Sequence, residues 1–163
     1  MTSQNTLHWQ PASCPSPEVT SAIGRPQPSS VASRRRMERQ LRRDTKPELD
    51  VRKAVWRRGL RYWVDISPLK GSRRRADLVF PRARVAVYVD GCFWHSCPRH
   101  SSTPKANREW WTAKLEANVR RDRDADLRLA ENGWVVVRVW EHEDANQAAR
   151  RIEALVRSRG ATR

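Results

Sequence analysis

One short stretch, VYVDGCFWHSCPRH (residues 87–100), combines side chains that a buried core rarely needs together. An apolar run ends in an aspartate, and two cysteines and two histidines follow within a few residues. Zinc takes four thiolate or imidazole ligands in a tetrahedron. A distant element often closes such a site, and the fourth candidate directly follows a later apolar run. The candidate ligands of a closed, structural zinc site are Cys92, Cys97, His100 and His142. The alternative is two buried cysteines and two surface histidines.

The remaining histidine of the stretch, His95, has acidic neighbours. Asp77 lies at an end of one apolar run and Asp90 at the end of the next. Adjacent strands lie about 4.8 Å apart, so these two carboxylates can converge on one hard cation. Mg²⁺ held by one or two carboxylates keeps waters that a phosphate can displace. His95 could then take a proton from an attacking water, which predicts a nuclease site. Alternatively, each acid is a solvated strand-end carboxylate.

The charge of the chain indicates what such a site would act on. The 163 residues carry a formal net charge of +15, and residues 34–75 contain 16 basic against 5 acidic side chains. This excess predicts a polyanionic partner, with nucleic acid first and an anionic membrane surface second. No apolar run approaches the roughly 20 residues that span a bilayer, and no secretory signal is visible. Three cysteines make no disulfide framework, so a cytoplasmic location is expected.

The site must be positioned by a layered α/β domain with a mixed sheet. Thr45 and Pro47 begin a helix that closes at Arg58-Gly59. Residues 85–89 are almost entirely apolar, which favours a central strand. The other expected elements are an edge strand at 61–64, a basic loop at 70–75, strands at 76–80 and 134–140, and helices at 107–132 and 143–159.

The N-terminal part of the chain differs in composition from the rest. Residues 1–33 hold five prolines and seven serines with almost no charge, which predicts a disordered tail. His8 and Cys14 fall in this tail and are therefore left out of the site. Residues 34–163 form the single expected domain.

Five motifs occur in an order that resembles a known family. They are Thr45-Lys-Pro-Glu-Leu49, Ala76-Asp-Leu-Val-Phe80, Gly91-Cys-Phe-Trp-His95, Asn118-Val-Arg-Arg-Asp122 and Gly133-Trp134 with Val139-Trp-Glu141. Together they look like the very short patch repair (Vsr) DNA mismatch endonucleases, over about residues 34–145. The resemblance implies a restriction-endonuclease-like fold of the PD-(D/E)xK type with a structural zinc. It also implies a nick on the 5′ side of the mismatched T of a T·G pair, the product of 5-methylcytosine deamination.

The resemblance assigns catalytic roles by position. Asp77 matches the Mg²⁺-binding aspartate, and His95 matches the histidine that activates water. Glu48 matches a glutamate that reaches into the site from the N-terminal helix. Asp122 matches an aspartate that supports a second catalytic histidine. This chain has Asp90 where that second histidine is expected, so Asp90 is interpreted as an additional metal ligand.

The resemblance also assigns the contacts with DNA. Phe93, Trp94 and Trp111 match aromatic residues that wedge into DNA beside the mismatch, and Met37 matches a residue inserted from the opposite groove. A T·G wobble pair stacks poorly, so separating it costs less than separating a Watson–Crick pair. Inserted aromatic side chains return part of the few kcal/mol that unstacking costs. The alternative is that Phe93 and Trp94 are ordinary core residues.

Two rival functions are also compatible with these residues. One is a non-catalytic zinc module that binds DNA, and the other is a restriction-like nuclease that acts on intact duplex, RNA or another lesion. The joint presence of Glu48, Asp77 and His95 argues against the first. The aromatic wedge favours a lesion over intact duplex. A single compact domain further predicts a monomer that works on double-stranded DNA in the nucleoid, with no membrane partner.

Overall fold

The computed structural model describes residues 27–160 except 40, 42 and 101. The expected tail, residues 1–33, lies mostly outside this range, and a helix begins at Val31. The helices are α2 (Val31–Arg39), α3 (Lys46–Arg57), α4 (Arg108–Glu131) and α5 (Ala145–Gly160). The strands are β1 (Leu78–Phe80), β2 (Val85–Asp90) and β3 (Val135–Trp140). No helix in the described part of the chain is long and apolar enough to cross a membrane.

The three strands form one mixed sheet in the order β1-β2-β3. β2 pairs antiparallel with β1 and parallel with β3, with Tyr88 opposite Arg138 and Asp90 opposite Trp140. The apolar run at 85–89 is therefore the central strand, as predicted. Because β2 and β3 are parallel, the residues that follow them, including the loop after Asp90 and His142, emerge at the same edge of the sheet.

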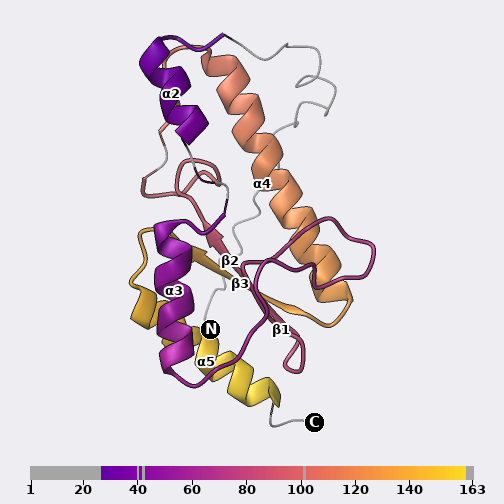
Figure 1. Ribbon diagram of the computed structural model, residues 1–163. Helices are drawn as coiled ribbons and strands as arrows, with labels where there is room; N and C mark the ends of the chain where they lie inside the picture. Colours follow the sequence, from indigo (N-terminus) through magenta and orange to yellow (C-terminus); the bar gives the residue numbers. More distant parts are fainter. Residues whose placement is uncertain (1–26, 40, 42, 101, 161–163) are drawn as a thin grey trace, which may run out of the picture.

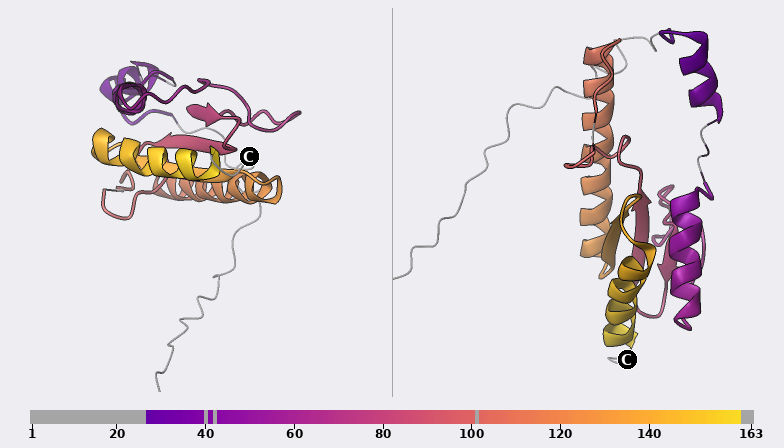
Figure 2. Two further views of the ribbon diagram at one scale, coloured as in Figure 1. Left: turned by 90° about the horizontal axis from the view of Figure 1, so that it is seen from below. Right: turned by 90° about the vertical axis from the view of Figure 1, so that its left-hand side faces the viewer.

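Helices cover both faces of this sheet. Figure 2 shows α4 on one side and α3 and α5 on the other. The larger core lies on the α3 and α5 side, where Val87, Val139 and Ile152 are completely buried. A smaller core lies under α4, around Val79 and Leu129. α2 stands apart from the sheet, level with the N-terminal end of α4 (Figure 1). The expected layered α/β architecture is confirmed.

The edge strand expected at residues 61–64 is not formed as a strand. This segment contributes single antiparallel bridges instead, Trp63 to Val79 and Ile66 to Ala76. Between them Asp65 has φ of 51°. That left-handed conformation turns the backbone and interrupts a continuous ladder. β1 also begins at Leu78 rather than Ala76, and the Asp77 N–H donates to the Val87 carbonyl at 3.0 Å.

Two side chains of the same chain cover the C-terminal part of the outer edge of β3. The Trp140 N–H donates to Glu143 Oε1 at 2.8 Å, and Arg151 Nη2 donates to the Arg138 carbonyl at 2.8 Å. Glu143 and Arg151 also pair with each other at 3.1 Å. Since N–H and C=O groups of alternate residues point to the same side of a strand, these two groups face away from β2.

Candidate functional site

The four predicted zinc ligands converge. The ligand atoms of Cys92, Cys97, His100 and His142 all lie within 4.8 Å of one another. The Nδ1 atom of His142 is 3.1 Å from the Cys92 sulfur and 3.8 Å from the Cys97 sulfur, and that of His100 is 3.9 and 3.8 Å away. A tetrahedral zinc with bonds of about 2.0–2.3 Å separates sulfur from nitrogen by about 3.5 Å. The cluster is therefore compatible with a metal site of this kind.

The loop that carries this cluster folds back on itself directly after β2. The His95 N–H donates to the Gly91 carbonyl at 3.1 Å, and the Cys97 N–H donates to the Cys92 carbonyl at 2.9 Å. Glu141, at the end of the parallel strand, accepts the Cys92 N–H at 2.7 Å. This glutamate was part of a recognised motif, but its contact with the cysteine loop was not predicted.

Asp77 and Glu48 lie in an acidic group near the carboxyl end of β2. Asp77 Oδ2 accepts the Val89 N–H at 2.7 Å. Burial raises the pKa of Asp77 to about 6, and the negative charges of Glu48 and Asp90 add to this rise. The carboxyl groups of Glu48, Asp77 and Asp90 therefore lie near one another in a largely buried region. A divalent cation would relieve their repulsion.

Glu48 is itself buried at the N-terminus of α3. Its two carboxylate oxygens accept the Asp44 N–H at 2.8 Å and the Thr45 hydroxyl at 2.9 Å. Arg52 Nη2 is 3.3 Å from the same carboxylate. These contacts resemble a capping box, in which a glutamate in the first turn closes the helix start. They hold the Glu48 side chain in one place whether or not it also contacts a cation.

His95 is held by a residue of α4. Its Nδ1 lies 2.6 Å from Asp122 Oδ2 and 3.6 Å from Asp90 Oδ1. Burial alone lowers the pKa of His95, but the hydrogen bond to Asp122 and the charges of Asp90 and Asp122 raise it above its ordinary value. One helical turn earlier, Asn118 Nδ2 donates to the Trp94 carbonyl at 3.1 Å. Residues four apart lie on one helix face, so α4 fixes the loop at two successive points.

Arg138 on β3 links the acids of the site, and the sequence interpretation missed it. Its Nη1 donates to both oxygens of Asp90 at 2.9 and 2.8 Å. Its Nε and Nη2 donate to the two oxygens of Asp126 at 2.9 and 3.0 Å. Burial lowers the pKa of Arg138, but its contacts with Asp126 and Asp90 outweigh this and raise it further. One feature of the sequence could have pointed to Arg138, because it is the single charged residue in an otherwise apolar strand, VVVRVW.

Asp122 lies close to one histidine and two arginines, His95, Arg138 and Arg74. Burial raises its pKa, but the hydrogen bond from His95 and the charges of His95, Arg138 and Arg74 hold it below the ordinary value. Asp122 is therefore a carboxylate at neutral pH. Such a carboxylate keeps the imidazole proton on Nδ1 and leaves Nε2 as the acceptor.

The predicted wedge residues form one aromatic cluster. Phe93 lies 5.1 Å from Trp94 and 5.3 Å from Trp111 between ring centroids, and the two tryptophans are 5.9 Å apart. Trp110, which the sequence interpretation did not name, is 4.9 Å from Trp111. All four rings are only partly buried. Met37 lies in α2, but its side chain is outside the described part of the structure.

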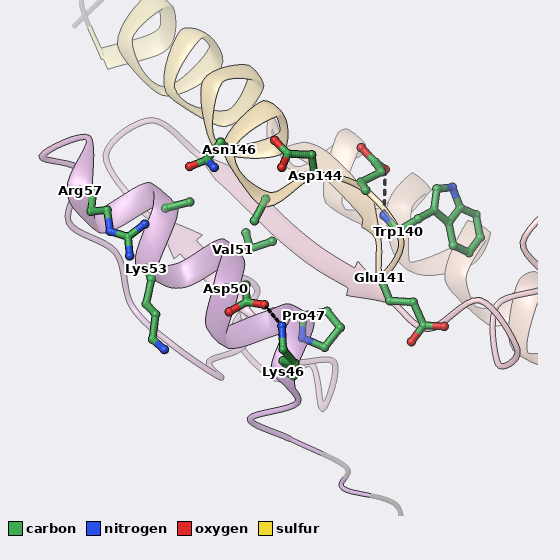
Figure 3. A pocket seen from close by; sticks show the side chains of 13 residues that line it. Lys46, Pro47, Asp50, Val51, Lys53, Arg57, Trp140, Glu141, Asp144 and Asn146 are labelled. Carbon is green, nitrogen blue, oxygen red and sulfur yellow. Dashed lines mark hydrogen bonds and ion pairs between the residues drawn. The ribbon is translucent and has the colours of Figure 1, made fainter.

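A separate pocket of about 490 Å³ lies between α3 and the segment after β3. Figure 3 shows its mixed lining, with Lys46, Lys53 and Arg57 on one side and Glu141 and Asp144 on the other. None of the predicted catalytic residues, metal ligands or wedge residues lines this pocket. The residues of the predicted chemistry gather instead at the end of β2 and along α4.

Comparisons with known proteins show which family the sequence is similar to. A model of the family described as DNA mismatch endonuclease Vsr matches residues 30–100. The Type II nicking enzyme V.NaeI of Lentzea aerocolonigenes is 42% identical over 125 residues, covering 76% of this chain and 75% of the relative. V.XorIIP of Xanthomonas oryzae pv. oryzae, another Type II nicking enzyme, is 37% identical, with coverage of 79% and 93%. The DNA mismatch endonuclease Vsr of Escherichia coli (strain K12) is 36% identical, with coverage of 61% and 62%.

Proposed function

Since the chain belongs to the Vsr family of DNA mismatch endonucleases, we propose that it nicks duplex DNA on the 5′ side of the mismatched T of a T·G pair. The reaction is Mg²⁺-dependent phosphodiester hydrolysis. The observation that carries the proposal is the contact of His95 Nδ1 with Asp122 Oδ2 at 2.6 Å, on the loop that also carries Phe93 and Trp94 of the aromatic cluster. The relatives named as nicking enzymes favour cleavage of one strand.

In this mechanism His95 is the base. Asp122 accepts a hydrogen bond from the Nδ1–H of His95, so Nε2 is free to take a proton from the attacking water. Asp77 and Glu48 would hold Mg²⁺, which when bound neutralises charge that develops on the phosphate. Both oxygens of Asp90 accept hydrogen bonds from Arg138, so a cation at Asp90 would share the carboxylate with that guanidinium. In the proposed restriction-endonuclease-like fold, the sheet carries Asp77 and Asp90 at the ends of its strands, and α3 supplies Glu48.

The aromatic cluster would supply the mismatch recognition. We expect Trp111→Ala to weaken binding to a T·G duplex about tenfold and to leave binding to a matched duplex unchanged. A stacked aromatic contributes about 1–3 kcal/mol per base, and only the weak pair can be opened cheaply. Fluorescence anisotropy with both duplexes measures this. Trp56→Ala on α3, where the side chain is 53% exposed, is the matched control. An equal loss on both duplexes would contradict the wedge.

The cysteine–histidine cluster would hold a structural Zn²⁺. We expect one zinc per purified chain and none after Cys97→Ser, with a melting temperature lower by at least about 10 °C. The reason is that metal binding contributes directly to the folding free energy. Elemental analysis and thermal melting measure these quantities. The control, Cys14→Ser, removes the one cysteine outside the cluster. Full zinc content in the Cys97→Ser protein would rule out this ligand set.

A strand-specific nicking assay tests the proposed function. Labelled duplexes carry T·G, U·G, another mismatch or none, in several methylation-site contexts, with Mg²⁺ present. The expected result is a Mg²⁺-dependent nick 5′ to the mismatched T. Cleavage of matched duplex would instead identify a restriction-like nuclease. Tight binding without a nick on any substrate would identify a non-catalytic binding module.

We further propose that the protein acts as a monomer on nucleoid DNA in the cytoplasm, with α2 carrying Met37 to the opposite groove.

A further inference from the structure

A basic pocket of about 600 Å³ lies beside the candidate active site, between the loop at 68–74 and the C-terminal half of α4. Its lining includes five basic side chains, Lys70, Arg73, Arg74, Arg121 and Arg128. Asp124 is the only acid among the residues described as lining it. The pocket is therefore suited to an anionic ligand.

Most of this positive charge is not neutralised within the protein. Within the described ranges, Lys70, Arg73, Arg74 and Arg128 have no carboxylate oxygen within 4.0 Å. By contrast, Arg75 at the end of the same loop pairs with Asp65 at 2.9 Å. Tyr88 also lines the pocket, and its buried hydroxyl has no hydrogen-bond partner in the described structure. An unsatisfied buried hydroxyl beside unpaired cations is a feature that a bound anion or water would explain.

The pocket is close to the catalytic groups. Arg74 is near enough to Asp122 for its charge to act on that carboxylate. Along α4 the aromatic Trp111, the supporting Asp122 and the pocket residue Arg128 follow one another. At about 1.5 Å per residue, Asp122 lies about 16 Å from Trp111 and about 9 Å from Arg128 along the helix axis. The residues of α4 and its C-cap that line the pocket run from Arg121 to Asn132, so the pocket begins beside Asp122 and extends away from Trp111.

We propose that this pocket binds backbone phosphates of the nicked strand on the 5′ side of the nick, two to three nucleotides from it. The inference rests on the proposed function, which places the mismatched T and the aromatic cluster on the 3′ side of the nick. In the proposed complex the nicked strand runs along α4. Successive phosphates of one strand advance about 3.4 Å along the duplex axis, so the about 9 Å from Asp122 to Arg128 corresponds to two or three steps. The contact reads no base, and it fixes the register of the strand over His95.

The test compares the double variant Arg73→Gln/Arg128→Gln with the control Arg82→Gln/Arg150→Gln. The control removes the same charge from exposed arginines outside the pocket. All proteins carry Asp77→Asn, so that binding is measured without cleavage. Each lost phosphate contact reduces the salt slope by about 0.9. From about 50 to 200 mM salt, the parent should therefore lose about tenfold more affinity for a matched duplex than the pocket variant does. The control should follow the parent.

Phosphate position is tested with methylphosphonate substitutions. Neutral phosphonates at the second and third positions 5′ of the expected nick should weaken the parent and leave the pocket variant unchanged. The same substitutions 3′ of the mismatch should weaken both proteins equally. The inference would be overturned if the pocket variant kept the parent's salt slope. It would also be overturned if the pocket variant were unaffected by phosphonates on the 3′ side of the mismatch instead of those on the 5′ side of the nick. If the unsubstituted enzyme nicks no mismatched duplex, the proposed function fails, whereas the matched-duplex salt slopes still decide whether the pocket binds phosphate.

Discussion

Replacement of Asp77 with asparagine is expected to reduce nicking by at least about 1,000-fold while DNA binding persists. Asparagine can still accept the Val89 N–H, so the local fold is retained. It carries no negative charge, so the acidic group with Glu48 loses its main attraction for a divalent cation. Lewis-acid stabilisation of a phosphoryl transition state is worth several kcal/mol, and each 1.36 kcal/mol is tenfold in rate.

Single-turnover nicking of the T·G duplex and anisotropy on the same duplex measure the two quantities. Asp50→Asn is the matched control, because this partly exposed α3 acid pairs only with Lys46 among the described residues. It should nick at the parental rate. Nicking by Asp77→Asn within tenfold of the parent would remove Asp77 from the catalytic site, and loss of binding would assign it a role in the fold.

The second large effect is expected from Asp122→Asn, which should slow nicking about a hundredfold or more and shift its pH dependence. A base must be unprotonated, so the parental rate should rise with pH through the pKa of His95, which lies above the ordinary histidine value. Asparagine removes the negative charge that stabilises the imidazolium. The pKa of His95 then falls, and the midpoint of the pH profile moves to lower pH.

Single-turnover rates across the pH range, at saturating DNA and Mg²⁺, measure this shift. The control is Glu116→Gln, which removes a negative charge from an exposed residue of the same helix. It should leave both the nicking rate and the midpoint of the pH profile unchanged. A slower Asp122→Asn enzyme with an unmoved midpoint would show that Asp122 supports the loop and leaves the titrating base unaffected. That outcome would separate a structural role from the proposed one.

The sequence predicted the parts of the site that depend on order along the chain. An unbroken apolar run at 85–89 predicts a central strand, and a parallel neighbour then brings His142 to the loop that holds Cys92. For these ligands a short segment with a strong local pattern fixes the position of the side chain. The aromatic residues Phe93, Trp94 and Trp111 were assigned only through the family resemblance, and they do cluster in the structure.

Interactions between elements were harder to predict. Asp122 was expected to support a histidine at the position of Asp90, whereas in the structure it contacts His95, because the turn after Gly91 brings that ring toward α4. Arg138 contacts acids from β2 and α4 together, and no local pattern encodes such a contact. The bend at Asp65 also follows from tertiary pairing on both sides of it.

The partly covered edge of β3 has a consequence for association between molecules. An open strand edge offers unpaired N–H and C=O groups to which another chain can add a strand. Here Glu143 and Arg151 already occupy the Trp140 N–H and the Arg138 carbonyl. Edge-to-edge addition of a second copy would have to displace both side chains and their mutual ion pair. The C-terminal part of β3 is thus less open to strand addition by a second copy than a bare edge would be.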